Sequence, residues 1–589
     1  MSYATYLAGN PTDKDHWTGV GSNNQVYFML PEGMSAAQVQ AQLPAFAQKY
    51  IQPDPQKYEF VVQPLGELHF NTEFNGVAPK SIIAALGLVG LFLLLTACIN
   101  FVNLATAQAM HRAKEVGIRK VVGSGRGLVF AQFMAETFFI VLLATVLGVL
   151  LAQLSLPYAR TLTQTDIFIR PGDLRFWAFL GGLMTLATFL AGAYPALIIS
   201  GFRPAVVIKG GADQRAMGGY NVRRALVVAQ FAVCQLLIIA SLVMGRQMDF
   251  IKNADLGFNP MAVINVPLPE TDKAQTLGGQ MRQIAGVNKI SFNDGPPAFG
   301  NNNTSNCRFD THEKDEPWMV QTKPGDDQFV QVFDLQLVAG RNVLPADSLR
   351  ETLLTETAVR KLGLTKPEDA LGKRFQIWGK WTEVVGVVKD FHTQSLQEAI
   401  TPTVIIPSPN SYSNISLKID LDRKDAVIKS VEAIWDRAFP KHFFEYDFAD
   451  AQVAQFYELE DVLLRLVRFF CGVAIFIACL GLYGLVSYLA LRKRKEIGVR
   501  KVLGASSGSI VAIFGKEFGL LLLLGFGLAA PLGYWAMRGW LDEYVYRIPL
   551  STGIFLAAIG FAGLVALLTV TWQSLRASWT NPVESLKTD

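Results

Sequence analysis

Residues 114–123 read KEVGIRKVVG, and residues 495–504 read KEIGVRKVLG. Seven of the ten positions are identical, and the other three exchange one aliphatic residue for another. The same offset of 381 residues aligns Glu136 with Glu517, and each of these acids lies near the start of an apolar segment that follows its block. The chain therefore contains an internal repeat, and the repeat organises the rest of the sequence.

Long apolar segments surround both blocks. The hydrocarbon core of a bilayer is crossed by ~20 mostly apolar residues in a helix. Of the 589 residues, 51% are hydrophobic and 17% are charged, a composition too apolar for an ordinary soluble protein. The sequence predicts an α-helical polytopic membrane protein with about seven spans, at residues 82–107, 128–157, 176–200, 225–244, 464–490, 509–537 and 552–573.

Lysine and arginine are concentrated in three of the short loops, namely those after the first, third and fifth spans. Cationic loops are retained on the cytoplasmic side, so both repeat blocks and the C-terminus are predicted to be cytoplasmic. Residues 1–80 and roughly 246–462 are then predicted to lie outside. Because residues 1–80 contain no apolar run, we expect a transmembrane helix upstream of them.

The large outer segment alternates short β-like runs, such as FQIWG and TEVVGVV, with helical stretches such as AVIKSVEAIWDRAF, so a mixed α+β domain is predicted. Asp390, Phe391 and His392 follow one of these strands. A catalytic role for His392 and a role in fixing the loop are both open, and an outer-domain enzyme is one alternative for the whole protein. No H-E-x-x-H motif or obvious nucleophile pair supports catalysis.

Several other classes of site are disfavoured. Four of the five cysteines lie in apolar runs, which leaves Cys307 as the only thiol in a polar region and no disulfide framework. The net charge is only +4, and no stretch interleaves basic residues with aromatic ones, so a nucleic-acid partner is not expected. No CxxC or Cys/His zinc motif occurs, so no metal site is predicted. No G-x-x-x-x-G-K-[ST] phosphate loop occurs either, so no nucleotide or other cofactor is expected to bind this chain.

Three groups of strings carry a resemblance to a known family. KEVGIRKVVGS and RKEIGVRKVLGAS, each followed by a span with its glutamate (AETFF and KEFGL), resemble the core of FtsX-like permease domains. FDLQLVAGR, LLTETAVRKLG and VVGVVKDFHTQSLQEAITP are similar to the periplasmic core domain of MacB-like permeases. Residues 25–70 resemble the tail of a preceding periplasmic domain. The chain as a whole resembles an FtsX/MacB-like ABC transporter permease that lacks the first transmembrane helix.

This resemblance implies a division of the chain into five parts. Residues 1–80 would be the remnant of a first periplasmic domain, and residues 81–210 the first FtsX-like transmembrane unit. Residues 211–245 would contain a linker and an extra span, followed by the MacB-like periplasmic core domain at 246–462. The second FtsX-like unit would occupy residues 463–589. Both units have the same orientation, which is typical of parallel repeats.

The resemblance also implies the function and the partners. It implies a permease of the bacterial inner membrane that is not itself an enzyme and that works with a separate cytoplasmic ABC ATPase, which binds ATP and Mg²⁺. ATP hydrolysis would move the periplasmic domain, a mode called mechanotransmission, for export, efflux or extraction of a substrate. A homodimer or pseudo-symmetric permease pair, the lipid bilayer and a periplasmic adaptor are the other expected partners. Transmembrane signalling without transport, in control of a cell-wall hydrolase or sensing of an antimicrobial peptide, is the alternative.

The repeat blocks are the candidate ATPase-coupling sites. Glu115 and Arg119, like Glu496 and Arg500, are spaced i, i+4 and support a short helix. Val116, Ile118, Val121 and Val122 would give this helix a partly apolar face for docking on a partner. The alternative is that the blocks only anchor the span ends at lipid headgroups. The candidate coupling residues are Lys114, Glu115, Gly117, Arg119, Lys120, Gly123, Lys495, Glu496, Gly498, Arg500, Lys501 and Gly504.

The span-start acids Glu136 and Glu517 form a second candidate set. A carboxylate is costly inside a bilayer unless it reaches the interface or a partner. We expect each to pair with an arginine of the cytoplasmic block. A proton relay is the alternative, although the spans contain almost no deeper acids to continue it.

Overall fold

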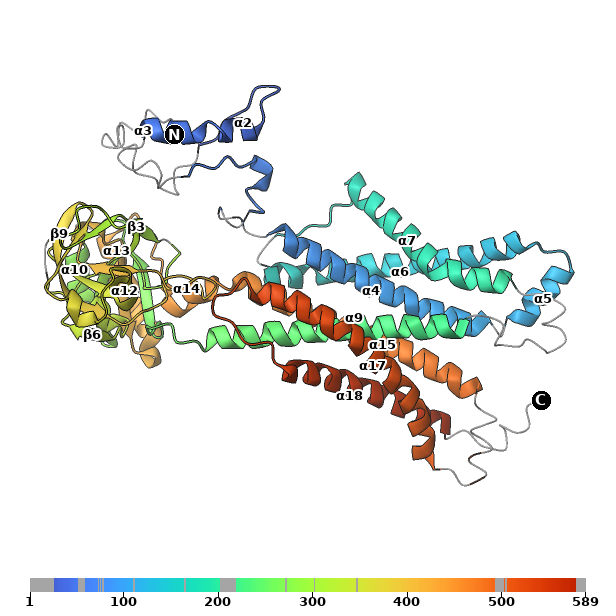
Figure 1. The fold of residues 1–589 in the computed structure, drawn as a ribbon. Helices are drawn as coiled ribbons and strands as arrows, with labels where there is room; N and C mark the ends of the chain where they lie inside the picture. Colours follow the sequence, from blue (N-terminus) through green and yellow to red (C-terminus); the bar gives the residue numbers. More distant parts are fainter. Residues whose placement is uncertain are drawn as a thin grey trace. The chain divides into compact units, whose positions relative to one another are not determined.

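The computed structural model describes residues 26–50, 59–71, 74, 76, 79–109, 112–163, 166–201, 219–270, 273–300, 302–345, 348–492, 500, 503 and 506–578. The chain forms two compact units, residues 1–91 and 92–589. Figure 1 shows their elements as a ribbon.

The described residues of the first unit form the short helices α2 (Ala36–Gln40) and α3 (Leu43–Tyr50) and a 3-10 turn at Leu65–Glu67. Ser35 and Gln38 cap the start of α2 reciprocally, so two backbone amides without helical partners are satisfied. The Gln40 side chain donates to the Phe60 carbonyl and accepts from the Val62 amide, both at 2.7 Å. These bonds hold the segment after α3 beside α2. The assignment of residues 1–80 to a periplasmic domain stays a prediction.

Among the described residues, seven helices are long and apolar enough to cross a membrane, as predicted. Several extend beyond the predicted spans, because a helix can continue past the hydrocarbon region where its side chains turn polar. The fourth reaches Lys252 instead of residue 244, and the fifth begins at Glu458 instead of 464. They are α4 (Lys80–Ala109), α6 (Arg126–Thr163), α7 (Leu174–Ser200), α9 (Gly219–Lys252), α15 (Glu458–Arg492), α17 (Ser507–Leu541) and α18 (Thr552–Ser578).

The helices of the second unit pack in two groups. Helix α6 packs along α7, whereas α9 packs against α15, α17 and α18. The groups meet where α4 crosses α15, and there the Asn100 amide donates to the Ile477 carbonyl at 2.5 Å. A Cβ at Gly481 would overlap the Asn100 side chain, and one at Gly484 would lie 2.5 Å from Leu104. These two glycines therefore permit close helix packing.

The outer domain contains two sheets and is mixed α+β, as expected. The smaller sheet has the strand order β12-β1-β11-β2, all antiparallel. The larger has the order β3-β5-β10-β7-β9-β8-β4, with β6 paired to β9. The strands are β1 (Val263–Pro267), β2 (Val287–Asn293), β3 (Asn303–Ser305), β4 (Cys307–Phe309), β5 (Val320–Pro324), β6 (Leu337–Gly340), β7 (Glu351–Thr355), β8 (Arg374–Ile377), β9 (Lys380–Val388), β10 (Thr403–Ile406), β11 (Asn414–Ile419) and β12 (Asp447–Phe448).

Each sheet is covered by amphipathic helices. Helix α13 places Val427, Val431 and Trp435 in the core of the smaller sheet, and Trp435 is only 2% exposed. Burying such side chains contributes about 1.5–3 kcal/mol each. Cys307 is buried in the core of the larger sheet, so it is a packing residue and not a surface thiol. The domain's helices are α10 (Ala274–Met281), α11 (Phe329–Val332), α12 (Glu356–Lys361), α13 (Lys424–Ala438) and α14 (Ala449–Gln455).

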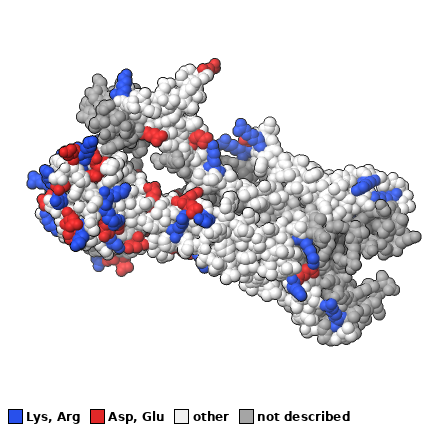
Figure 2. Space-filling view, in the orientation of Figure 1, with Lys and Arg blue, Asp and Glu red and all other residues white. Residues whose placement is uncertain are grey.

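Charged side chains in the second unit are segregated. Figure 2 shows them over the outer domain and at the opposite ends of the helices, with a largely uncharged surface along the helices between. An uncharged helix surface is what contact with hydrocarbon requires, because burying a charge in lipid is costly. The fold is therefore a membrane-spanning helix bundle with an outer α+β domain at one end.

Candidate functional site

The first repeat block forms a short helix, α5 (Ala113–Val121), between α4 and α6. Gly123 ends it with a positive φ of 112°. Its amide donates to the Lys120 carbonyl at 3.2 Å, and the Ser124 amide donates to the Arg119 carbonyl at 3.0 Å. These two bonds form a Schellman motif, in which glycine is favoured because it has no Cβ to oppose a positive φ. Gly123 thus sets where the coupling helix ends.

A chain of polar contacts ties α5 to the start of α6. Glu115 pairs with Arg119 at 2.6 Å, the i, i+4 contact that the sequence predicted. Arg119 also donates to the Gln132 side chain at 3.0 Å, and Gln132 donates to Glu136 at 3.1 Å. Glu136 in turn pairs with Arg112 at 2.9 Å. Each pair is half exposed and contributes no more than about 1 kcal/mol, so the network orients α5 more than it stabilises the fold.

Gln132 was missed by the sequence analysis. It lies four residues before Glu136 on α6, so the two side chains share one face of the helix. Helical spacing alone could therefore have indicated Gln132 as a partner of Glu136. Arg112, by contrast, was among the cations of the predicted cytoplasmic loop, immediately before the block. Glu136 therefore pairs with an arginine of the predicted cytoplasmic loop, but this arginine lies two residues before the block and not within it.

A second tether joins α5 to α7. The Lys120 ammonium donates to the carbonyl of Ser200, the last residue of α7, at 2.6 Å. Terminal carbonyls of a helix lack intrahelical partners and carry partial negative charge, so a lysine there is favourable. Partial burial, together with the nearby Arg126, lowers the pKa of Lys120. Val116 and Gly117 are buried on the same helix, which contacts α7.

The opposite side of α5 is apolar and exposed. The exposed fractions are 58% for Ile118, 65% for Val121 and 82% for Val122. The prediction that Val116 shares this face is wrong, since Val116 is only 4% exposed. The reason is the helical period, because residues two apart point to different sides of a helix. The helix thus has one side fixed to the bundle and another that is open to a partner.

Most of the second block, Lys495, Glu496, Gly498, Lys501 and Gly504, lies outside the described residues, and so does the side chain of Lys114. Arg500 is described and exposed.

Glu517, at the start of α17, pairs with Arg224 of α9 at 2.9 Å. This arginine belongs to another transmembrane helix. The expected pairing of Glu517 with an arginine of the second block, most of which lies outside the described residues, stays a prediction. No local sequence pattern indicates the pairing with Arg224, because Arg224 and Glu517 are brought together only by the packing of α9 on α17.

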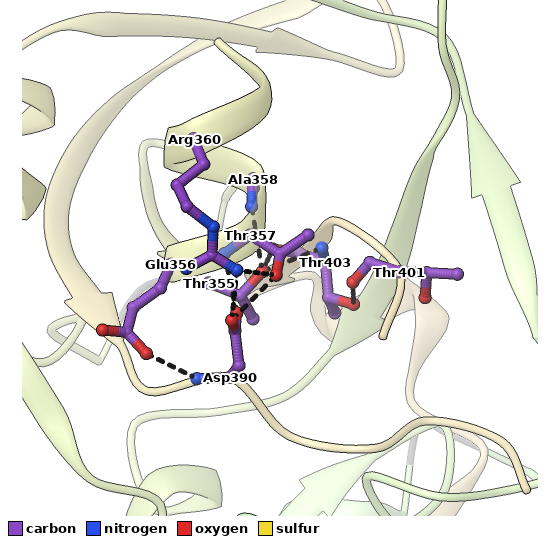
Figure 3. Close-up of polar contacts among 8 residues, drawn as sticks. All are labelled: Thr355, Glu356, Thr357, Ala358, Arg360, Asp390, Thr401 and Thr403. Carbon is purple, nitrogen blue, oxygen red and sulfur yellow. Dashed lines mark hydrogen bonds and ion pairs between the residues drawn. The ribbon is translucent and has the colours of Figure 1, made fainter. Parts of the chain in front are cut away.

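The outer-domain residues that follow β9 have structural partners. Asp390 accepts from the Thr357 amide at 2.6 Å and from the Thr357 hydroxyl and the Arg360 guanidinium, each at 2.8 Å (Figure 3). Its own amide donates to Glu356 at 3.2 Å. Asp390 therefore fixes the loop after β9 to the first turn of α12. This arrangement corresponds to the loop-fixing alternative. All the contacts of the Asp390 carboxylate that Figure 3 draws are with residues of α12.

His392 is 7% exposed and lies edge-on to Tyr546, with 4.9 Å between ring centroids. Burial lowers its pKa, against the raising effect of Asp255 and Asp390. Within the described ranges, no group of three or more His, Cys, Asp or Glu residues could hold a metal ion. The histidine therefore packs at a joint between the outer domain and the membrane helices.

That joint links three parts of the second unit. The Tyr546 amide, in the loop between α17 and α18, donates to the Leu396 carbonyl at 3.3 Å. The Leu396 amide donates to the Tyr457 hydroxyl at 2.7 Å, and the Gln397 side chain donates to Glu460 of α15 at 2.7 Å. On the membrane side, Gln247 of α9 donates to the Tyr546 carbonyl at 3.0 Å. These hydrogen bonds connect the outer domain directly to α15 and to the α17–α18 loop, which is itself bonded to α9.

Two family models match the chain. The FtsX-like permease C-terminal model matches residues 87–204 and again residues 468–582. The MacB-like periplasmic core domain model matches residues 235–434. The two permease matches contain the two repeat blocks, and the periplasmic match lies between them.

Two relatives of the chain are ABC transporter permeases. The chain is 22% identical over 280 residues to the uncharacterized ABC transporter permease YknZ of Bacillus subtilis, covering 44% of this chain and 68% of that one. It is 23% identical over 244 residues to the uncharacterized ABC transporter permease MJ1507 of Methanocaldococcus jannaschii. That alignment spans 37% of this chain and 58% of the relative, which is less than two thirds of its length.

Solved structures of outer domains are also similar. The periplasmic region of MacB from Actinobacillus actinomycetemcomitans is 15% identical, with a TM-score of 0.25, and 33% of this chain covers 92% of it. The extracellular domain of YknZ, described as a noncanonic ABC-type transporter, is 18% identical, with a TM-score of 0.24, and 31% of this chain covers 98% of it. The two family models and the named relatives show that the chain belongs to the FtsX/MacB-like ABC transporter permeases and is a multi-pass inner-membrane protein.

Proposed function

We propose that this chain is the permease subunit of an ABC transporter that couples ATP hydrolysis by a separate cytoplasmic ATPase to movement of the outer domain, for export or extraction of a substrate. The two FtsX-like units of one chain form the pseudo-symmetric permease pair, with a homodimer as the alternative pairing and a periplasmic adaptor as a further partner. ATP and Mg²⁺ bind to the ATPase. The repeat blocks and the C-terminus face the cytoplasm.

The observation that carries this proposal is the two-sided character of α5. Its exposed side offers Ile118, Val121 and Val122, and amphipathic helices of this kind dock in grooves of partner proteins. Its other side is tied to α6 through Arg119 and to α7 through Lys120. A displacement of α5 by the ATPase would therefore move two transmembrane helices at once, which anchoring at lipid headgroups does not require.

The outer joint supplies the second half of the coupling. The Leu396–Gln397 segment is bonded to α15, to the α17–α18 loop and, through Tyr546, to α9. Helix movement at the cytoplasmic end would then change the position of the outer domain through rigid elements. This corresponds to the mechanotransmission that the resemblance implies.

The test begins with co-purification of the chain with candidate ABC ATPases, taking every ATPase of the host cell that has no membrane domain of its own. ATPase assays in proteoliposomes follow. Val121→Asp places a charge on the docking side of α5 without touching its tethers, so we expect about tenfold weaker binding of the ATPase. Val545→Asp is the matched control, because Val545 is 56% exposed in the outer loop at the opposite end. It should leave ATPase binding unchanged.

Glu136→Gln separates transmission from docking. It removes the charge that pairs with Arg112 and leaves the exposed side of α5 intact. We expect normal ATPase binding but loss of the permease's effect on ATPase activity. Replacing Glu115 and Glu496 together should weaken the complex, because Glu115 supports α5 by pairing with Arg119 and the repeat predicts the same i, i+4 support from Glu496. Unchanged binding in the Val121→Asp and double-glutamate variants would refute the coupling role of the blocks.

A further inference from the structure

A groove of about 630 Å³ lies between α9 and α17, near the ends of these helices that are opposite the outer domain. Its rim is charged and consists of Arg224, Lys516 and Glu517. All its other lining residues are apolar. The groove therefore combines a polar rim with an apolar interior on the surface of a membrane protein.

The rim has one cation more than it has acids. Arg224 pairs with Glu517 at 2.9 Å, so these two charges balance each other. Lys516 is exposed and, within the described ranges, has no ion-pair partner. Basic pockets between transmembrane helices on the cytoplasmic side bind anionic lipid headgroups. In the predicted orientation, the rim faces the cytoplasmic leaflet and its excess charge favours such a headgroup.

The apolar part of the groove is a long furrow. Leu520, Leu524 and Leu528 follow one another at intervals of four residues, so they form one row along α17. Their exposed fractions are 56%, 52% and 52%. Ala225 and Ala229 of α9 face this row, and their small side chains leave room between the two helices.

The furrow has the length of one bilayer leaflet. From Glu517 to Leu528 an α-helix rises about 16 Å. The hydrocarbon core is about 30 Å thick, so one leaflet contributes about 15 Å. An acyl chain whose headgroup lies at Lys516 would therefore follow the leucine row to near the bilayer midplane. A free anion would occupy the rim alone and leave the row uncovered.

The internal repeat provides a comparison surface that lacks the lysine. The offset of 381 residues aligns Lys516 with Ala135 and Leu524 with Leu143. Leu143 is 63% exposed on α6, at the same distance from its span-start acid as Leu524. Both units thus present leucines to lipid at equal depth, but only the second has a cation beside its span-start acid.

We propose that the α9–α17 groove binds one anionic phospholipid, with its phosphate at Lys516 and an acyl chain along Leu520, Leu524 and Leu528. The charge at the rim selects the headgroup, and the furrow holds the chain. This site goes beyond the coupling function, and it exists whether or not α5 contacts an ATPase.

The test uses the full chain in phosphatidylcholine nanodiscs. Each sample contains equal trace amounts of phosphatidylglycerol and phosphatidylcholine probes that carry the same photoreactive acyl chain and are distinguished by mass. Mass spectrometry gives the ratio of phosphatidylglycerol to phosphatidylcholine crosslinks at each site. We expect a ratio of about five around Leu524 and about one at Leu143, because one lysine near an anionic headgroup gives a preference of that size. Loss of folded protein lowers both yields and leaves the ratio unchanged.

Three variants test the headgroup site. Lys516→Gln removes the cation and should lower the ratio around Leu524 to about one. Lys516→Arg keeps the charge and should keep the preference. Arg175→Gln is the charge-matched control, because Arg175 is an exposed cation at the start of another helix, α7. It should leave the ratio unchanged.

Two further variants test the place of the acyl chain. Ala229→Leu fills the furrow opposite the leucine row, so it should reduce crosslinking around Leu524 by both probes relative to Leu143. Gly519→Leu is the matched control, because Gly519 lies on α17 outside the groove with no atom near an added Cβ. Unchanged crosslinking in the Ala229→Leu variant would contradict binding of the chain in the furrow.

Three other results would overturn the proposal. Equal crosslinking by the two probes around Leu524 would show ordinary contact with the bilayer. A preference that Lys516→Gln leaves unchanged would assign it to another cation. Loss of the preference in excess inorganic phosphate, at constant ionic strength, would show that the rim binds a free anion. A preference that Lys516→Gln abolishes and Arg175→Gln preserves supports the phospholipid site.

Discussion

At the scale of single residues, the candidate coupling helix depends on two features with different physical origins. Gly123 ends α5 because its backbone adopts a conformation that disfavours any side chain. Glu136 lies at the start of a long apolar helix, where its carboxylate is balanced by Arg112. The glycine determines where the helix stops, and the acid determines how the helix is oriented on the bundle.

Replacing Gly123 by alanine should loosen the end of α5. An added Cβ meets no neighbouring atom, so the expected cost is purely conformational, about 1–2 kcal/mol for a left-handed L-residue. Hydrogen exchange should therefore be about tenfold faster at Ser124, whose amide bonds to the Arg119 carbonyl. Gly125→Ala, two residues later, is the control, because Gly125 also has open space but no positive φ. Equal exchange in both variants would contradict this role for Gly123.

At the scale of elements, α9 connects the two ends of the helix group that it forms with α15, α17 and α18. Near one end Arg224 pairs with Glu517 of α17. Near the other, Gln247 donates to the Tyr546 carbonyl and accepts from the Ile548 amide, both at 3.0 Å. The backbone of the α17–α18 loop is therefore fixed to the Gln247 side chain of α9, and this attachment does not depend on the side chains of the loop. The same loop contacts the outer domain, which makes α9 part of the joint.

Gln247→Leu should destabilise this joint. Gln247 is fully buried, and its loss leaves a backbone carbonyl and a backbone amide without partners, at an expected cost of about 2 kcal/mol. The midpoint of thermal unfolding in detergent micelles should fall accordingly. Gln235→Leu is the control on the same helix, because Gln235 bonds only a carbonyl within α17 and its own oxygen has no partner. That variant should be close to neutral, and an equal loss in both would contradict the prediction.

At the scale of the whole molecule, the unit of residues 92–589 carries its charged side chains mainly at two opposite ends. The outer domain carries charges of both signs, and lysines and arginines lie at the opposite helix ends (Figure 2). Cationic side chains near span ends are retained on the cytoplasmic side. The predicted orientation therefore places α5 in the cytoplasm and the α+β domain outside.

Cysteine labelling can test this orientation. Val122→Cys on α5 and Phe443→Cys on the outer domain replace side chains that are 82% and 90% exposed. In cells whose outer membrane is permeabilised, a membrane-impermeant maleimide should label Phe443→Cys at once. It should label Val122→Cys only after the inner membrane is opened. Four of the five native cysteines are buried, so the unsubstituted chain gives the background. Immediate labelling of Val122→Cys would reverse the orientation and exclude the coupling proposal.

The sequence by itself determined the features that depend on local patterns. Seven apolar segments, the duplicated block and the strands and helix of the outer domain could all be read from residue order, because lipid and secondary structure impose fixed lengths and periods. The Glu115–Arg119 pair was predictable for the same reason, since helical spacing alone brings the two side chains together.

Only the tertiary structure decided which distant elements meet. The pairing of Arg224 with Glu517 spans 293 residues, and the tether from Lys120 to Ser200 spans 80. The burial of Val116 and the role of Asp390 in fixing the loop after β9 to α12 also follow from packing. No local pattern encodes such contacts, because a side chain's partners across the bundle depend on how every helix is placed and rotated against its neighbours.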